Sequence, residues 1–248
     1  MRYLNAETVC AMTGVHPSTL KSWKRAGLIS SPESHSLGYS WAQYIRINHI
    51  LLLTARGDTL REVYNLIYFP LRYQHSGWTI RQEEIIALLC DRLELTLFKT
   101  LRQMSTDYDS EHFVTCLLMP LNALLQNDDR PGSEERRTLF HRMVVQQAMR
   151  VMQASERQKA IPIFLEAVSM NNETEVWMEC IRLTGLGFRV ELSALATGIP
   201  ASPWRRHEHH MMWCGAGISE SMNNAFLQRL GNGAPVMLCG PDKMVRPA

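Results

Sequence analysis

The chain has 248 residues, of which 46% are hydrophobic, so it can form one large domain or two to three small ones around a real core. It holds no apolar run near 18 residues, which argues against a membrane-spanning helix, and its first residues lack the basic-then-apolar layout of a signal peptide. Six scattered cysteines without a Cys-x-x-Cys pair indicate reduced thiols, so we expect a cytoplasmic protein.

The charge is unevenly distributed along the chain. The net charge is +2, but residues 1–75 hold eight lysines and arginines against four acids, which is a local charge of +4 and leaves −2 for the remainder. Local basicity supplies affinity for phosphate. The charge therefore favours the N-terminal third as the part that binds a nucleic acid.

The start of the chain predicts a helix-turn-helix. A first helix is expected over residues 6–13, and Gly14 supplies the turn. In the second helix, Leu20 and Trp23 are three residues apart and face inward. That spacing leaves the other polar and cationic side chains of this helix facing outward, namely Thr19, Lys21, Ser22, Lys24 and Arg25.

A wing and two further helices follow in what we take as the first domain, residues 1–71. Residues 30–38 are rich in Ser, Pro and Gly, which suits a hairpin or wing. Helices are expected over 40–56 and 59–68, each capped by the hydroxyl side chain at its start. A helix-turn-helix of this kind places its second helix in a DNA groove.

The second domain, residues 78–158, is predicted to be a helical bundle. Its apolar positions keep a helical period over residues 79–104, 107–126 and 133–158, with Pro120 as an expected kink in the middle helix.

The third domain, residues 159–248, alternates strands and helices, which predicts a Rossmann-like parallel sheet with helices on its faces. Strands are expected over 161–168, 188–195, 210–214 and 235–239, and helices over 173–186 and 220–230. The predicted fold class is therefore multidomain, α followed by α/β.

Residues 19–29, Thr-Leu-Lys-Ser-Trp-Lys-Arg-Ala-Gly-Leu-Ile, resemble the recognition segment of the MerR family of transcription regulators. The similarity continues through Tyr39-Ser40, Gly57 and Val63. The order of the three domains is similar to that of MlrA-like regulators, which carry a helical bundle and a cobalamin-binding-like domain. The resemblance implies a homodimer that binds double-stranded promoter DNA through a winged helix and senses a signal or protein partner through its C-terminal module.

Two features depart from that family pattern. The family wing carries an arginine where this chain has Leu37, which predicts weaker or differently shaped DNA binding. Cobalamin-binding relatives carry a histidine after the first strand of the sheet, whereas residues 170–174 here contain none. We therefore expect a cobalamin-binding-like fold without cobalamin, and no other cofactor.

The resemblance and the exposed positions together give seven candidate DNA contacts. Lys21, Lys24 and Arg25 suit phosphates, and Lys21 can alternatively reach a guanine edge. Helix packing stays open as the role of His16, and a core position as the role of Tyr39. The candidate set is His16, Thr19, Lys21, Ser22, Lys24, Arg25 and Tyr39.

Other motifs give weaker indications of a metal, ligand or catalytic site. Residues 207–210, His-Glu-His-His, lie near Cys214 and resemble metal ligands, but neighbouring strand residues point to opposite faces, so no metal site is expected. Residues 213–217 can be a ligand-binding turn or a plain tight turn. No catalytic arrangement is visible, so we expect no enzyme.

The alternative to a regulator is an antagonist with a degenerate winged helix that acts by binding another regulator.

Overall fold

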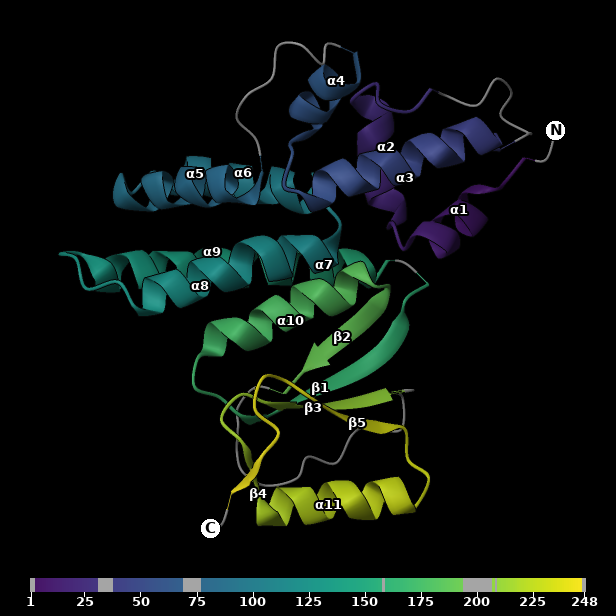
Figure 1. Cartoon of the computed structure of the whole chain (residues 1–248). Helices are drawn as coiled ribbons and strands as arrows, with labels where there is room; N and C mark the ends of the chain where they lie inside the picture. Colours follow the sequence, from purple (N-terminus) through teal and green to yellow (C-terminus); the bar gives the residue numbers. More distant parts are fainter. Residues whose placement is uncertain are drawn as a thin grey trace. The chain divides into compact units, whose positions relative to one another are not determined.

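The computed structural model describes residues 3–30, 38–68, 77–157, 159–193, 207 and 209–246 (Figure 1). The chain forms two compact units, Met1–Met143 and Val144–Ala248. Residues 31–37 of the expected wing, including Leu37, lie outside the described residues. The boundaries expected for the three domains stay predictions.

Four helices open the first unit, and they occupy the segments where helices were expected. Residue-specific caps explain where they begin: the Asn5 side chain caps the first helix, and Ser40 forms a capping box with Gln43 at the third. Gly14 adopts a φ of +73° and ends the first helix, as a left-handed glycine commonly does. The helices are α1 (Ala6–Thr13), α2 (Pro17–Arg25), α3 (Trp41–Ala55) and α4 (Leu60–Tyr68).

One hydrophobic core joins these four helices. Trp23 of α2 is fully buried in it, together with side chains from α1, α3 and α4. Leu4 and Tyr39 add a single antiparallel bridge, in which each backbone N–H donates to the other residue's carbonyl at 2.8 and 2.7 Å. The buried members include Val9, Leu20, Trp23, Ile47, Ile50 and Val63.

The rest of the first unit is helical, but the single helix expected over residues 79–104 is wrong. Arg92 has a φ of +54°, a left-handed conformation that a helix cannot continue through, and the chain breaks there into two helices. The helical period persists on both sides of the break, so the apolar pattern alone does not reveal it. The elements are α5 (Trp78–Cys90), α6 (Glu94–Asp107), α7 (Ser110–His112), η2 (Phe113–Leu118), α8 (Met119–Gln126) and α9 (Ser133–Ser155), of which α9 continues into the second unit.

The irregularity expected at Pro120 takes the form of a π-helical segment. Pro120 lies in the first turn of α8, and η2, which directly precedes α8, has the wider π-helical turn. Proline has no N–H to donate, so the helix loses one bond there. The wider turn of η2 keeps the chain helical through the proline.

The second unit contains a four-stranded, fully parallel sheet in the order β2-β1-β3-β5, which confirms the predicted α/β architecture. The crossovers β1-α10-β2 and β3-α11-β5 run in opposite directions from the centre of the sheet, so α10 and α11 cover opposite faces (Figure 1). The elements are β1 (Ile161–Ser169), α10 (Glu173–Gly185), β2 (Phe188–Leu192), β3 (His209–Cys214), α11 (Glu220–Gly231) and β5 (Val236–Cys239), with a separate small pair of β4 (Ile218–Ser219) and β6 (Val245–Arg246).

Candidate nucleic-acid interface

Helix α2 presents two exposed cations, Lys21 and Arg25, to solvent. Lys21 and Arg25 are four residues apart, so they lie one above the other on the same face of the helix. Lys24 is half-buried, with its ammonium nitrogen 4.6 Å from the centre of the Tyr39 ring. Such a cation–π contact fixes the side chain without neutralising its charge. Among the predicted cationic contacts, Lys21 and Arg25 are thus accessible to a phosphate, and Lys24 is partly accessible.

The prediction that Thr19 and Ser22 face outward is wrong. They are 3% and 6% exposed, because they lie beside Leu20 and Trp23 and widen the buried stripe of α2. Tyr39 is 3% exposed, so its alternative role as a core residue is the one that the structure supports.

His16 caps the N-terminus of α2. Its ring Nδ1 accepts a hydrogen bond from the Ser18 backbone N–H at 3.3 Å and lies 2.7 Å from the Ser18 hydroxyl. Burial lowers the pKa of the imidazole, and the nearby Asp109 carboxylate opposes that shift only in part. Neutral imidazole is the form that can accept the bond. The role of His16 in the structure is therefore to begin the helix that carries the cations.

A residue that the sequence did not suggest, Asp107 at the end of α6, anchors α2. The Ser22 hydroxyl donates to its Oδ1 at 2.5 Å, and the Trp23 indole N–H donates to its backbone carbonyl at 2.9 Å. Gln103 donates to the other carboxylate oxygen at 2.7 Å. The pKa of Asp107 is raised, because the effect of burial exceeds the opposing effects of the bonds from Ser22 and Gln103 and of the charge of Arg25. No local motif could have revealed this contact, because Ser22 and Asp107 are 85 positions apart.

A second set of contacts joins α3, α4 and the loop between them to the start of α5 and the end of α6. The Glu62 carboxylate accepts from Arg81 at 2.8 Å, and both side chains are 7% exposed. The Trp78 indole N–H donates to the Ala55 carbonyl at 2.7 Å, and the Tyr108 hydroxyl donates to the Gly57 carbonyl at 3.2 Å. The helix-turn-helix and the helices that follow it are therefore held as one unit.

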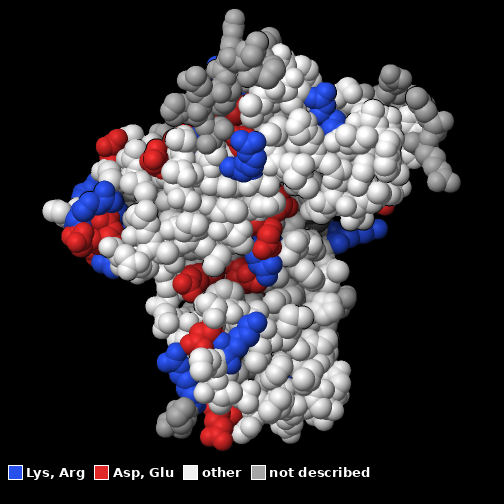
Figure 2. Space-filling view, viewed as in Figure 1, with Lys and Arg blue, Asp and Glu red and all other residues white. Residues whose placement is uncertain are grey.

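Burial makes the surface of residues 3–68 more basic than their sequence suggests. Asp58 and Glu62 are 0% and 5% exposed, so two of the acids of this region are withdrawn from the surface. Arg56 and Arg61 are exposed and were not among the predicted contacts. On the face drawn in Figure 2, lysines and arginines are scattered among uncharged side chains rather than gathered in one field.

The loops that follow strands β1 and β3 contact each other. The backbone N–H of Gly215 donates to the Ser169 carbonyl at 2.8 Å, and the Asn171 amide donates to the Gly215 carbonyl at 3.2 Å. A Cβ at position 215 would lie 2.9 Å from that Ser169 oxygen. The loops after β1 and β3 are thus bonded to each other where such sheets usually bind ligands. Residues 170–174 and 213–217 contain no histidine, so these two loops offer no imidazole that could ligate cobalt.

The histidines near residue 210 have separate partners. His207 lies 3.1 Å from a Glu191 oxygen, whereas His210 lies 2.8 Å from a buried Glu166 oxygen. In the parts of the chain that the structure describes, no three His, Cys, Asp or Glu side chains gather as metal ligands; Glu208 is not described. Burial raises the pKa of the Cys214 thiol to about 11, the opposite of what a reactive thiol needs.

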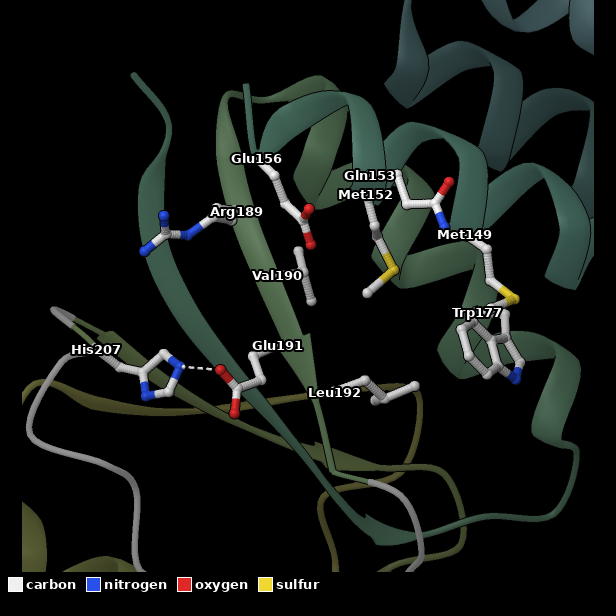
Figure 3. A pocket seen from close by; sticks show the side chains of 10 residues that line it. All are labelled: Met149, Met152, Gln153, Glu156, Trp177, Arg189, Val190, Glu191, Leu192 and His207. Atoms are coloured by element: carbon white, nitrogen blue, oxygen red, sulfur yellow. Dashed lines mark hydrogen bonds and ion pairs between the residues drawn. The ribbon is translucent and has the colours of Figure 1, made fainter. Parts of the chain in front are cut away.

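One cavity of the second unit was not predicted. It has a volume of about 860 Å³ and lies between the end of α9, α10 and strand β2 (Figure 3). Its described lining residues are Met149, Met152, Gln153, Glu156, Trp177, Arg189, Val190, Glu191, Leu192 and His207.

Comparison with protein families identifies the N-terminal region. Residues 4–68 match the family described as MerR HTH family regulatory protein, which suggests a DNA-binding transcription regulator. No curated protein matches the chain. None of the helices described is both long and apolar enough to cross a membrane.

Proposed function

We propose that the protein is a sequence-specific, MerR-type transcription regulator of the cytoplasm. It binds double-stranded promoter DNA as a homodimer, with α2 of each copy in a major groove and the two copies on half-sites related by two-fold symmetry. The observation that carries this proposal is the pair of exposed cations, Lys21 and Arg25, on the second helix of a segment that matches a DNA-binding family.

The roles of the α2 residues follow from their exposure. Lys21 and Arg25 contact phosphates or, for Lys21, a guanine edge. Lys24 contacts a phosphate from its place on the Tyr39 ring. His16 sets the start of the helix and, being only half-buried, also contacts the DNA backbone. Thr19 and Ser22 are buried on the inner side of α2 and do not contact DNA.

Residues 78–248 form the regulatory part and sense a signal, for which we propose a protein partner. The loops after β1 and β3 support a partner over cobalamin, because they are bonded to each other and contain no histidine that could ligate cobalt.

Genome-wide crosslinking of the tagged full-length protein tests the proposal. The wild-type chain should give discrete promoter peaks, and Lys21→Ala/Arg25→Ala should lose them. The matched control is Lys99→Ala/Arg102→Ala, which removes two exposed cations from α6 and should keep the peaks. Peaks that survive the α2 double substitution would overturn the assignment of α2.

A second candidate function is an antagonist whose winged helix acts by binding another regulator. One observation favours it: with Thr19 and Ser22 buried, α2 offers few polar groups for reading bases. The same crosslinking experiment separates the two, because an antagonist gives no peaks of its own and co-purifies with another regulator.

A further inference from the structure

Strand β2 is an edge strand among the described residues of the second unit, since it pairs with β1 alone. The Gly187 carbonyl accepts from Ile161, and the Ser193 N–H donates to Leu165, so the backbone groups of residues 187 and 193 point toward β1. Backbone groups alternate in direction along a strand. The outward-pointing groups on the other side are therefore those of Phe188, Val190 and Leu192.

The 860 Å³ cavity follows this outer edge. Four consecutive residues of β2, Arg189–Leu192, line it. Successive side chains of a strand point to opposite faces, so a cavity over one face would contact only alternate residues. Because the cavity contacts all four, it reaches both faces of β2 among the described residues, with Met152 and Trp177 on one side and His207 on the other (Figure 3).

The sequence of β2 is complementary to itself when it is read in the opposite direction. In an antiparallel pair centred on Val190, Arg189 lies opposite the partner's Glu191, and Phe188 lies opposite the partner's Leu192. Each opposite-charge or apolar cross-strand pair of this kind stabilises a sheet. The backbone N–H and C=O groups of Val190 point outward, so Val190 forms a hydrogen-bonded pair with the partner's Val190. Arg189 and the partner's Glu191 then form one of the closer, non-hydrogen-bonded pairs beside it.

We propose that β2 pairs antiparallel with β2 of a second copy about a two-fold axis through Val190. This inference rests on the homodimer of the proposed function and names its surface. The charges are accessible: Arg189 is exposed, and the Glu191 side chain is 40% exposed. A carboxylate has about four acceptor sites, so Glu191 can accept a bond from a second copy in addition to its contacts within the chain, one of which is with His207. Pairing also covers Met149, which is 50% exposed beside the same cavity.

Charge reversal at two positions tests the pairing. The full-length variants Arg189→Glu and Glu191→Arg each place like charges opposite each other in a self-pair, and each should weaken self-association about tenfold in analytical ultracentrifugation at low salt. Mixing the two variants restores both opposite-charge pairs, so the mixture should dimerise as the wild-type chain does. The double variant Arg189→Glu/Glu191→Arg should also recover, and the control Lys243→Glu, an exposed cation away from β2, should not change.

The mixing experiment excludes simple misfolding, because two damaged chains would not restore each other. A monomeric wild-type chain, unchanged self-association of both single variants, or a mixture that stays monomeric would overturn the pairing. Its failure is distinct from failure of the proposed function. Promoter peaks together with charge variants that still dimerise would reject only the strand pairing, whereas charge-dependent dimers without peaks would reject only the regulator.

Discussion

The Ser22 hydroxyl donates a hydrogen bond of 2.5 Å to the Asp107 carboxylate, which ties the cation-bearing helix α2 to the end of α6. The Trp23 indole adds a second bond to the same residue. The orientation of Lys21 and Arg25 thus depends on a residue far along the chain. We infer that a change at the end of α6 alters DNA binding without touching the DNA.

Asp107→Ala should destabilise the protein and weaken DNA binding together. The substitution leaves the buried Ser22 hydroxyl without its acceptor, and we expect a loss of about 1–3 kcal/mol in the free energy of unfolding. Urea denaturation and a gel shift measure the two effects. Asp107→Asn keeps an oxygen acceptor at the same place and is the matched control. If alanine and asparagine behave alike, the bond to Ser22 does not anchor α2.

Acidification should weaken the start of α2. Burial lowers the pKa of His16 from 6.5, so the neutral ring is favoured in the folded protein. A lowered histidine pKa gives stability that is fully present above 6.5 and is lost as the pH falls below that value. Thermal unfolding without DNA at decreasing pH should show this loss. His16→Asn, which caps a helix without titrating, should reduce the pH dependence; an unchanged pH profile would contradict the role of the ring.

Gly57→Ala should be far more damaging than Gly14→Ala. A Cβ at position 57 would lie 2.2 Å from the Trp78 backbone nitrogen, whereas one at position 14 meets nothing within 4 Å. Both glycines have positive φ, +88° and +73°, so the comparison separates a backbone clash from conformational strain alone. We expect about 1 kcal/mol for position 14 and several-fold more for position 57. Equal melting temperatures of the two variants would show that α3 and α5 are not packed this closely.

Trp23→Phe should cost less stability than Trp23→Ala. Alanine removes a fully buried aromatic ring and should cost about 3–5 kcal/mol, whereas phenylalanine keeps most of the packing and loses the bond to Asp107. Urea denaturation compares the two variants. A phenylalanine variant with wild-type stability and DNA affinity would show that the indole bond contributes nothing measurable.

Most helices and strands could be predicted because their ends and their buried faces are marked by nearby residues in the sequence. Glycine and cap residues mark the ends of α1 and α3, and apolar runs between helical periods mark β1 and β3. The break at Arg92 was missed because the apolar period continues through it. Such a break depends on backbone conformation, which the hydrophobic pattern does not encode.

The candidate site was predicted only in part, for a similar reason. The spacing of Leu20 and Trp23 gave the inward direction of α2, and Lys21 and Arg25 are exposed as expected. The burial of Ser22 depends on Asp107, and a contact between residues so distant in sequence leaves no trace in either segment. The cavity beside β2 likewise depends on tertiary packing.

The salt dependence of DNA affinity tests the central claim most directly. For a promoter fragment recovered by crosslinking, each phosphate contact contributes about one unit to the slope of log affinity against log salt. Lys21→Ala/Arg25→Ala should lower the affinity and reduce that slope by about two units, while Lys99→Ala/Arg102→Ala should keep both. A double α2 variant with the wild-type slope would contradict the claim that α2 binds the DNA.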